Sequence, residues 1–463
     1  MTDPHVVVAC LDTVRKDFYE RFASRLSELA TYRFQEMRAA SSWSVPSHAA
    51  MFGGRLPSET DIHTYNRNFE TLGPENTWLG GLDGYRTVAV SANTFASPAF
   101  GFDTLFDDCT SISPSCRLPE GIDVNGFIRN NAGEGIVDFI GAALDHPNPL
   151  HSVANAVLFK CYEATQGRSI KQPFDFGGAA IARRVRSELN GASEPTFVFA
   201  NFMDAHSPHT PFRGINDDHH DAPASFTSLN VDEEEINAAT DLGGEEAAVE
   251  HIRGLYGGAI AYLDNIVADL AIWCQDHLER DTILVITSDH GENLGFPDDD
   301  HMIGHTNSLS EGLLHVPFDV IGPVEPGETT VRTSLLDLGQ IVKQLRDDDQ
   351  PRPPGRELVT AEIAGHSADG TSEDLRGVQP ARRAAYVGDR KVVWTSDGDR
   401  TVYDIGGAPN AQSVLDDRKI DQERIETAFS VSLSEFAQTA REQEETLRVD
   451  ADVESRLERL GYR

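Results

Sequence analysis

Residues Val6-Val7-Val8-Ala9-Cys10-Leu11-Asp12 form a near-continuous apolar run that ends in a carboxylate. A run of this kind is typical of a strand covered on both faces. Similar runs occur at 87–91, Thr196–Phe202, Thr282–Thr287 and 316–321, and amphipathic stretches lie between them at 17–30, 179–189 and Glu246–His277. This alternation predicts an α/β fold with a mainly parallel sheet flanked by helices.

The order of these stretches along the 463 residues predicts two structural units. Weak periodicity and many Gly, Asn and Pro residues mark an insertion or cap at about 106–175. A charged, proline-rich segment at 347–354 marks a boundary, and antiparallel strands are expected beyond it at 384–387, 391–395 and 400–403. We therefore expect a large α/β domain over 1–345 and a smaller C-terminal α+β unit, made of an antiparallel sheet and helices, over 355–463.

The charge balance of the chain is strongly acidic. It has 39 Lys and Arg against 75 Asp and Glu, a net charge of −36, and only six of the basic residues are Lys. Nucleic-acid phosphates and anionic membranes repel such a chain, so we expect neither as a partner. An acidic surface with few lysines suits the salty cytosol of a halophile, where salt screens self-repulsion. An ordinary acidic protein is the alternative.

Cysteines and the N-terminus bear on the compartment. The five cysteines have no CxxC or zinc-ribbon spacing, although Cys109 and Cys116 could form a bridge in an oxidising compartment. The N-terminus runs directly into a strand, which predicts no signal peptide, and no apolar run approaches the length of a membrane span. We expect a cytoplasmic protein.

Polar clusters follow three of the predicted strands. They are Asp12 after the first strand, Asp204, His206 and His209 after 196–202, and Asp289, His290 and Glu292 after 282–287. Open α/β sheets bind ligands at the carboxyl ends of their strands. Any one of these residues could merely cap a loop, but carboxylates together with imidazoles are the ligands that a divalent cation prefers.

A candidate nucleophile is Ser44, in the segment Ser-Trp-Ser-Val-Pro-Ser-His at 42–48. Pro46 suits the first turn of a helix, so Ser44 would lie beside free helix amides that can bind an oxyanion. The pattern is also that of a simple N-cap. Downstream, Arg55 could hold an anion, and His301 and His305 lie in a loop rich in Gly and Asp, where they could also be plain surface residues.

Five motifs in this order resemble one known family. They are Leu-Asp-Thr-Val-Arg at 11–15, Ser-Val-Pro-Ser-His-Ala-Ala at 44–50 with Gly-Arg-Leu-Pro at 54–57, Asn-Phe-Met-Asp-Ala-His-Ser-Pro at 201–208, Thr-Ser-Asp-His-Gly-Glu at 287–292 and Gly-His-Thr-Asn-Ser-Leu at 304–309. Together they resemble the sulfatase-like branch of the alkaline phosphatase superfamily. Residues 386–404 resemble its small antiparallel subdomain, and 457–462 resemble its closing helix. Apart from the insertion, the resemblance covers nearly the whole chain.

The resemblance implies roles for individual residues. It implies a metal site made by Asp12, Asp289 and His290. Ser44 matches the nucleophile, which is a Cys or Ser oxidised to formylglycine in sulfatases and an unmodified Ser or Thr in phosphoesterases. His206 matches a histidine that binds the substrate oxyanion. His305 takes the place of a sulfatase lysine that binds the ester, or of a metal-binding histidine in two-metal relatives, so His206 and His305 join Ser44 as catalytic candidates.

Further assignments concern the substrate and the metal. Arg55, His48 and His209 are candidate substrate-binding residues. One divalent cation, Ca, Mg, Mn or Zn, is expected, and a second cation on Asp204, His209 and His305 is left open.

Two residues depart from the family pattern. Thr13 stands where many sulfatases have a second acidic metal ligand, and His48 stands where the formylglycine-forming motif has Arg. Both changes favour a serine hydroxyl activated by a metal over a formylglycine.

Our leading hypothesis is a metal-dependent hydrolase that acts on sulfate esters of a small molecule or glycan. The first alternative is a phosphodiesterase or phospho-group transferase with an unmodified Ser44. The alternative from another class is a catalytically silent, metal-binding member of the fold. The oligomeric state is left open.

Overall fold

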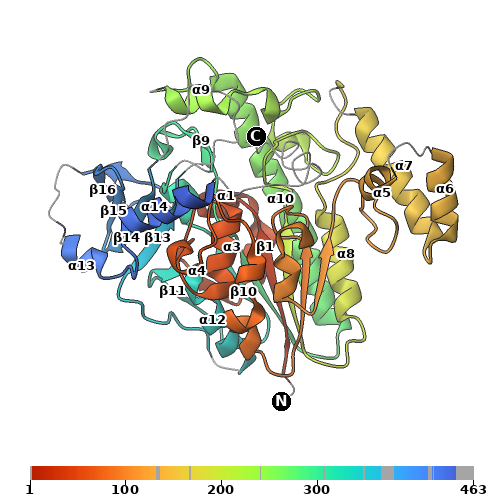
Figure 1. The fold of residues 1–463 in the computed structure, drawn as a ribbon, viewed down its shortest axis with the longest axis horizontal. Coiled ribbons are helices and arrows are strands. Elements are labelled where there is room, and N and C mark those ends of the chain that lie inside the picture. The colour runs from red at the N-terminus through yellow and green to blue at the C-terminus, as the bar shows by residue number, and fades with distance from the viewer. Residues whose placement is uncertain are drawn as a thin grey trace.

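The structure is a computed structural model that describes residues 3–131, 136–165, 168–239, 241–305, 308–347, 350–365, 380–415, 420 and 422–444. Figure 1 shows a central sheet covered by helices on both faces. A second sheet, near the C-terminus, lies on one side of this core, and helices α5 to α7 project on the opposite side.

The central sheet has eight strands in the order β11-β2-β10-β7-β1-β6-β4-β5. Its strands are β1 (His5–Leu11), β2 (Tyr32–Phe34), β4 (Arg86–Ser91), β5 (Asp108–Ser111), β6 (Thr196–Phe202), β7 (Thr282–Thr287), β10 (Phe318–Ile321) and β11 (Gly327–Thr329). β1 pairs in parallel with both β6 and β7, and β4 continues the parallel set, whereas β10 is antiparallel to β7 and β2. The predicted fold class, a mainly parallel sheet flanked by helices, is confirmed.

The central strand shows why its apolar run is continuous. Val6, Val8 and Cys10 pack into the hydrophobic cluster on one face of the sheet. The alternate residues Val7, Ala9 and Leu11 pack into the cluster on the other face. Because successive side chains of a strand point to opposite faces, every position is buried and must be apolar.

The principal helices of the large domain are α1 (Lys16–Phe22), α2 (Ser24–Leu29), α3 (Ser44–Gly53), α4 (Pro57–Thr60), α8 (Gly178–Leu189), α9 (Glu233–Ala238), α10 (Glu246–His277), α11 (Glu311–Leu314) and α12 (Leu338–Arg346). The single helix expected at 17–30 is broken at Ala23 into α1 and α2. Within the described ranges, α10 is the one helix long and apolar enough to cross a membrane, but 67% of its most apolar window is buried. It packs against α1, α2 and α8, as a core helix does.

The segment expected to be an insertion is in part a strand of the core. β5 pairs in parallel with β4 at the edge of the central sheet, so the projecting part begins after it. The helices α5 (Val124–Asn130), α6 (Ile136–Asp145) and α7 (Pro149–Thr165) follow. They have a small hydrophobic cluster of their own, built around Phe139 and Phe159.

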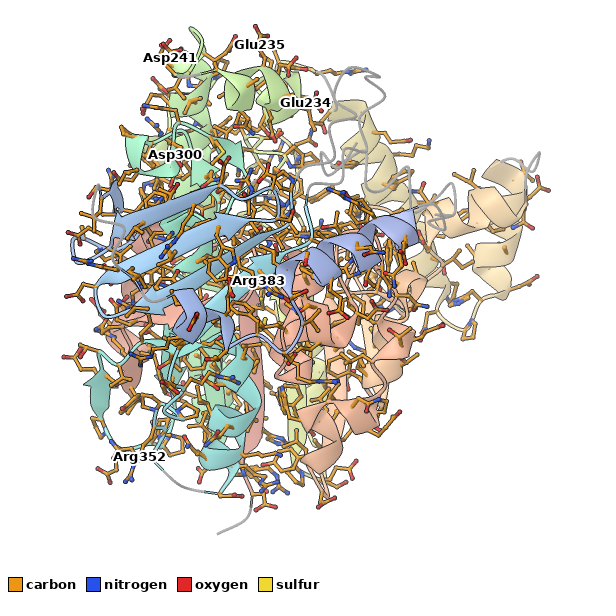
Figure 2. The ribbon with its side chains drawn as sticks, turned by 60° about the vertical axis from the view of Figure 1, so that its left-hand side comes forward. Glu234, Glu235, Asp241, Asp300, Arg352 and Arg383 are labelled. Carbon is orange, nitrogen blue, oxygen red and sulfur yellow. The ribbon has the colours of Figure 1, made fainter. Side chains whose placement is uncertain are left out.

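The C-terminal unit is an antiparallel sheet in the order β13-β14-β15-β16-β17. The three expected strands are β14 (Arg382–Val387), β15 (Arg390–Thr395) and β16 (Arg400–Asp404), and β13 (Val359–Ile363) and β17 (Ser413–Val414) were not anticipated. Helices α13 (Gln422–Glu426) and α14 (Leu433–Glu444) follow the sheet, and the closing helix expected at 457–462 lies outside the described residues. Figure 2 shows this sheet in front of the core, with Arg383 on β14, where it contacts Glu362 of β13 at 2.9 Å.

The C-terminal sheet shares its core with the large domain. Residues Val359, Ala361 and Tyr386 belong to the same hydrophobic cluster as Val6 and Val8 of β1. The two units therefore bury a common interface rather than two separate cores. All five cysteines are free, including Cys109 and Cys116.

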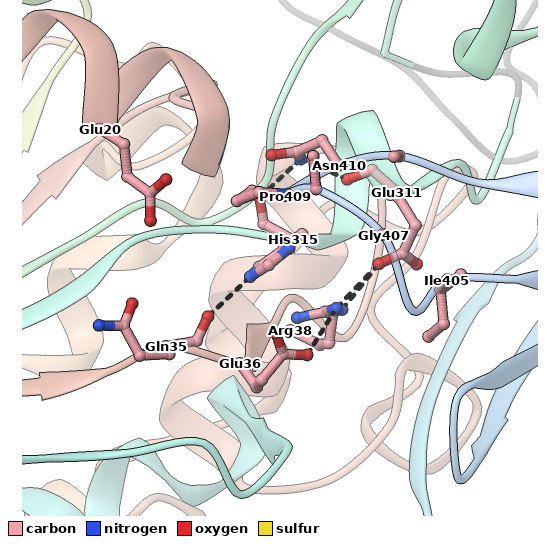
Figure 3. A pocket seen from close by; sticks show the side chains of 12 residues that line it. Glu20, Gln35, Glu36, Arg38, Glu311, His315, Ile405, Gly407, Pro409 and Asn410 are labelled. Atoms are coloured by element: carbon pink, nitrogen blue, oxygen red, sulfur yellow. Dashed lines mark hydrogen bonds and ion pairs between the residues drawn. The ribbon is translucent and has the colours of Figure 1, made fainter.

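A buried carboxylate fastens the two units together. Glu311 of α11 accepts hydrogen bonds from Arg38 Nε at 3.0 Å and from the Tyr386 hydroxyl at 2.6 Å, and Lys391 Nζ lies 3.1 Å away. Burial alone would raise the pKa of Glu311, but these two cations lower it below its ordinary value. Figure 3 shows Arg38 and Glu311 at the wall of a cavity of about 160 Å³ between the units.

We predict that Glu311→Gln lowers the free energy of unfolding by about 3–5 kcal/mol, because it leaves Arg38 and Lys391 buried beside a neutral amide. Chemical denaturation at fixed salt measures the loss. The control is Glu357→Gln, which removes an exposed ion pair with Arg424. That change should cost less than about 1 kcal/mol, and equal losses in the two variants would contradict the role given to Glu311.

Candidate active site

Four neighbouring strands of the central sheet and one helix bring the polar clusters together. β1 ends directly before Asp12, β6 ends shortly before His206, β7 ends before Ser288 and Asp289, and Asn93 follows the end of β4. These strands are parallel, so their carboxyl ends meet at one edge of the sheet. The N-terminus of α3 brings Ser44 to the same edge.

Asp12, Asp289 and His290 form a compact group of potential metal ligands. One ligand atom from each lies within 4.8 Å of the others, and all three side chains are fully buried. A second group among the described residues, Cys10 with His48 and Asp289, uses a thiol whose pKa burial raises well above its ordinary value. The first group is therefore the better candidate, since a thiol must lose its proton to bind a metal.

The charges around the two aspartates fit a bound cation. The basic groups in contact with their carboxylates, within the part of the chain that the structure describes, are imidazoles: His48 Nε2 at 3.2 Å and His290 Nε2 at 3.6 Å from Asp289 Oδ2. Burial and the neighbouring Asp289 both raise the pKa of Asp12. Burial also opposes ionisation of Asp289, but His290, His48 and Ser44 lower the pKa of this carboxyl overall. Two adjacent buried carboxylates without Lys or Arg are a donor set that suits a divalent cation.

His290 is held in the tautomer that a metal ligand needs. Its Nδ1 lies 2.8 Å from the Gly291 carbonyl oxygen, so this nitrogen carries the proton and Nε2 faces the aspartates with a free lone pair. Burial lowers the pKa of His290 to about 4, which keeps the ring neutral at neutral pH. A neutral imidazole is the form that binds a metal.

The Ser44 hydroxyl lies beside this group, fully buried at the first turn of α3. Its Oγ accepts a hydrogen bond from Asn93 Nδ2 at 3.0 Å. It lies 3.4 Å from His290 Nε2 and 3.5 Å from both carboxylate oxygens of Asp12. The structure thus places the candidate nucleophile against the candidate metal ligands and the helix amides.

A cluster of histidines lies next to these ligands. The ring of His305 is 4.8 Å from that of His290 and 5.0 Å from that of His206, measured between centroids. His305 Nδ1 contacts the buried Glu292 carboxylate at 3.0 Å, and this contact orients the imidazole ring. Burial lowers the pKa of His206 and brings that of His305 to about 4. His209 is also buried and packs edge-on against Tyr256.

Two of the residues predicted to bind substrate, Arg55 and His48, are not placed where a substrate could contact them at this site. Arg55 is exposed at the far end of α3 and contacts the Asn76 carbonyl oxygen, so the structure does not bring it to the cluster. His48 is fully buried behind Asp289, between the rings of Phe102 and Phe199, and not at a surface that a substrate reaches.

Asp204 and His301 are the remaining candidates from the sequence. Asp204 Oδ1 accepts the Phe176 amide at 2.9 Å, and a Cβ on Gly178 would lie 2.6 Å from Oδ2, so this carboxylate faces the start of α8. None of the metal-binding groups found in the described residues combines Asp204, His209 and His305. His301 lies in a turn at positive φ, and Thr306 and Asn307 lie outside the described residues.

Two residues at the site, Asn93 and Asn201, had no role in the sequence-based hypothesis, and Glu292 was named there only as a member of a polar cluster. Asn93 Nδ2 and Asn201 Nδ2 donate to Asp12 Oδ2 at 2.8 and 3.1 Å, and Glu292 orients His305. Asn93 follows a buried strand, as Asp12 and Asp289 do, and this position was the one feature of the sequence that could have identified it as a site residue. A lone asparagine in a loop is nevertheless too common for this signal to be decisive.

Thr13 has a conformation unusual for a β-branched residue, with φ of 64°. Its amide lies 3.4 Å from Asp289 Oδ1, and its carbonyl oxygen accepts the Tyr256 hydroxyl at 2.7 Å. The same hydroxyl accepts the Arg15 amide at 2.9 Å. Helix α10 thereby fixes the turn that follows Asp12.

A sulfatase family model matches residues 4–345 of this chain. The chain belongs to the sulfatase family. It is therefore a hydrolase of the alkaline phosphatase superfamily, and the resemblance inferred from the motifs is confirmed. A search of curated protein sequences finds no significant match.

Solved structures share the fold over nearly their whole length. A phosphonate monoester hydrolase of Agrobacterium radiobacter is 16% identical with a TM-score of 0.61, covering 95% of this chain and 96% of its own. A protein solved with its substrate D-glucosamine-2-N,6-O-disulfate is 12% identical with a TM-score of 0.59, covering 97% and 99%. A 2-O GAG sulfatase is 15% identical with a TM-score of 0.57, covering 98% and 96%. These likenesses show the fold.

We predict that Asp12→Asn changes stability in opposite directions with and without a cation, because burial and the neighbouring Asp289 disfavour the charge of Asp12. In chelator, the variant should unfold at a higher denaturant concentration than the wild type, by about 1–2 kcal/mol, because one of two adjacent buried charges is gone. With excess divalent cation, the wild type should gain more and become the more stable of the two. Denaturation of both proteins in each condition measures this reversal in the order of stability.

The control for this reversal is Glu311→Gln, since Glu311 already has cationic partners. It should be destabilising by the same amount in chelator and in cation. An Asp12→Asn variant that is less stable than the wild type in both conditions would show that the pair of aspartates needs no cation.

Proposed function

We propose that this protein hydrolyses sulfate monoesters of a small molecule or glycan, with Ser44 as nucleophile and one divalent cation, Ca, Mg, Mn or Zn, on Asp12, Asp289 and His290. The observation that carries the proposal is the position of Ser44 Oγ. It lies at a helix N-terminus, 3.0 Å from Asn93 Nδ2 and 3.4 Å from His290 Nε2. A cation held there would supply the Lewis acidity that activates a hydroxyl and neutralises the ester.

The residues of this chain supply the remaining parts of an in-line displacement. Ser44 Oγ forms a bond to sulfur while the bond from sulfur to the alcohol oxygen breaks. The proton that Ser44 loses passes to the leaving oxygen through His206 or His305, whose rings lie 5.0 Å apart. Water then attacks sulfur and gives one proton to the same histidine. The bond from sulfur to Oγ breaks, Oγ takes this proton, and hydrogen sulfate leaves. Amides at the start of α3 stabilise charge on the sulfuryl oxygens throughout.

The charge of the site supports esters with a single negative charge. Burial lowers the pKa of both His290 and His305 to about 4, so these two imidazoles are neutral at neutral pH. A phosphate monoester carries close to two negative charges at neutral pH. A sulfate monoester carries one, so it needs less compensation from a site that already holds two carboxylates.

A second candidate is a phosphodiesterase, phospho-group transferase or phosphonate monoester hydrolase with an unmodified Ser44. The observation that favours it is His48, which contacts Asp289 where the formylglycine-forming motif has Arg. Phosphodiesters and phosphonate monoesters also carry one negative charge. A catalytically silent binding protein is the third alternative. We further propose, from the sequence alone, a cytoplasmic protein of a halophile that works in strong salt.

We predict that, among aryl esters of one leaving group, kcat/KM is highest for the sulfate monoester and at least about tenfold lower for the doubly charged phosphate monoester. Steady-state assays in molar KCl, with each divalent cation in turn, measure the order. A higher kcat/KM for the phosphodiester or the phosphonate monoester would replace the leading function by the second candidate. Binding of the esters without turnover of any of them would support the third alternative, a catalytically silent binding protein.

We predict that Ser44→Ala lowers kcat by at least about 10³-fold while cation binding and folding persist. The matched control is Ser47→Ala, which removes a buried hydroxyl on the same helix that donates to the Ser41 carbonyl oxygen. It should cost about 1 kcal/mol of stability and leave kcat within a few-fold. The intact mass reports whether Ser44 has lost the two hydrogen atoms that formylglycine formation removes. An active Ser44→Ala enzyme would refute the proposed nucleophile.

A further inference from the structure

Exposed apolar side chains gather on the projecting helices, within a segment that we call the cap (residues 113–173). Eight of the twelve large hydrophobic side chains that are exposed in the described parts of the chain lie on this segment. Six of them form what we call the cap face: Val137, Ile140 and Leu144 on α6, and Leu150, Val153 and Val157 on α7. A concentration of exposed aliphatic groups of this kind marks an interaction surface.

The spacing of these six residues places three of them in one stripe on each of two adjacent helices. On each helix they recur at i, i+3 and i+7, which is one stripe. On α6 the exposed Ile140 and Leu144 each follow a buried residue, and on α7 Val153 follows the buried Ser152. Three residues join the two helices, which pack against each other, so the two stripes lie on neighbouring elements of the cap.

The cap face is not needed to build the cap itself. The inner core of the cap is formed by Val124, Phe139, Ala143 and Phe159, none of which belongs to the cap face. Figure 1 shows α6 and α7 on the side of the molecule away from the C-terminal sheet. No described element of this chain covers the six side chains, because all remain exposed.

Charge indicates what could cover this surface. The cap holds five Lys and Arg against six Asp and Glu, a net charge of −1, whereas the whole chain has −36. Two copies of so acidic a protein repel each other over most of their surface, and least where the surface is close to neutral. Helices that lie on membranes carry many Lys and Arg and often Trp, but the cap has no Trp and no excess of positive charge. The partner best matched to a neutral aliphatic face is an identical one.

We propose that the cap face is the interface of a homodimer, in which α6 and α7 pack against α6 and α7 of a second copy about a twofold axis. Such an interface is isologous, since each copy contributes the same patch. Two helical hairpins meeting in this way form a four-helix layer. Salt in the molar range screens the repulsion between the acidic bodies within about 3 Å, so the dimer is stronger in high salt than in dilute buffer.

The test is the mass of the full chain in solution, by sedimentation or light scattering across the micromolar range in molar KCl. The expected mass is twice that of the 50.7 kDa chain. The double variant Val137→Glu/Leu150→Glu places charges at the two most exposed positions of the cap face, 77% and 83% exposed, each in the first turn of its helix, where Glu is well tolerated. It should sediment as a monomer, with a dissociation constant at least about tenfold higher.

The matched controls are Val331→Glu and Val414→Glu, which make the same change at valines 54% and 63% exposed outside the cap. Both should remain dimeric. Far-UV circular dichroism and ester hydrolysis should match the wild type in all variants, and Val153→Ser/Val157→Ser is the milder replacement if the double Glu variant is misfolded.

A monomeric wild type, a dimer unaffected by the cap substitutions, or equal dissociation of the controls would each overturn the proposal. So would binding to anionic or neutral vesicles by a monomeric wild type that is lost in the cap variant, since the cap face would then be a membrane contact. Because hydrolysis is measured separately, a failure of the proposed function leaves this test unaffected.

Discussion

Two buried carboxylates, Asp12 and Asp289, lie side by side just beyond the carboxyl ends of the neighbouring strands β1 and β7. Both are fully buried, and their contacts in the described chain are with imidazoles, amides and hydroxyls rather than with Lys or Arg. Such a pair is costly in a low-dielectric interior unless a positive charge joins it. The features around it follow from that constraint: the amides of Asn93 and Asn201 satisfy Asp12, and His48 lies against Asp289.

Glu311 shows the other way in which this protein buries a carboxylate. It has Arg38 and Lys391 as permanent partners and joins the C-terminal sheet to the core. Its pKa is lowered by these cations, whereas the pKa of Asp12 is raised by burial and by its neighbour. The protein therefore compensates a structural carboxylate with Arg and Lys, whereas the carboxylates of the site have imidazoles and amides beside them, a donor set that suits a divalent cation.

The sequence was sufficient to predict the sheet and the cluster because both depend on local patterns. Continuous apolar runs gave four of the central strands to within a residue, and the polar residues after them meet at one edge. Contacts between segments distant in the sequence determine the features that were not predicted. These are the antiparallel direction of β10, the pairing of β5 with β4, and the strands β13 and β17. The orientations of His48, Asp204 and Arg55 could not be predicted from the sequence either. A motif determines which helix or loop carries a residue, but it does not determine the direction of the side chain. Asn93 was missed because its identity is ordinary and only its partners, Asp12 and Ser44, distinguish it.

The acidity of the chain affects the active site and the cap differently from the rest of the surface. A net charge of −36 keeps copies apart and disfavours anions in solution. The repulsion of anions is weaker at the active site, because its residues are buried and because neutral His290 and His305 and the N-terminus of α3 lie beside its carboxylates. The repulsion between copies is also weaker at the cap, because the cap has a net charge of −1 and exposes aliphatic side chains. Screening by salt acts on the exposed charges and much less on a buried site. High salt should therefore strengthen contacts between caps while changing the chemistry at Ser44 little, so association and catalysis respond to salt as separate properties.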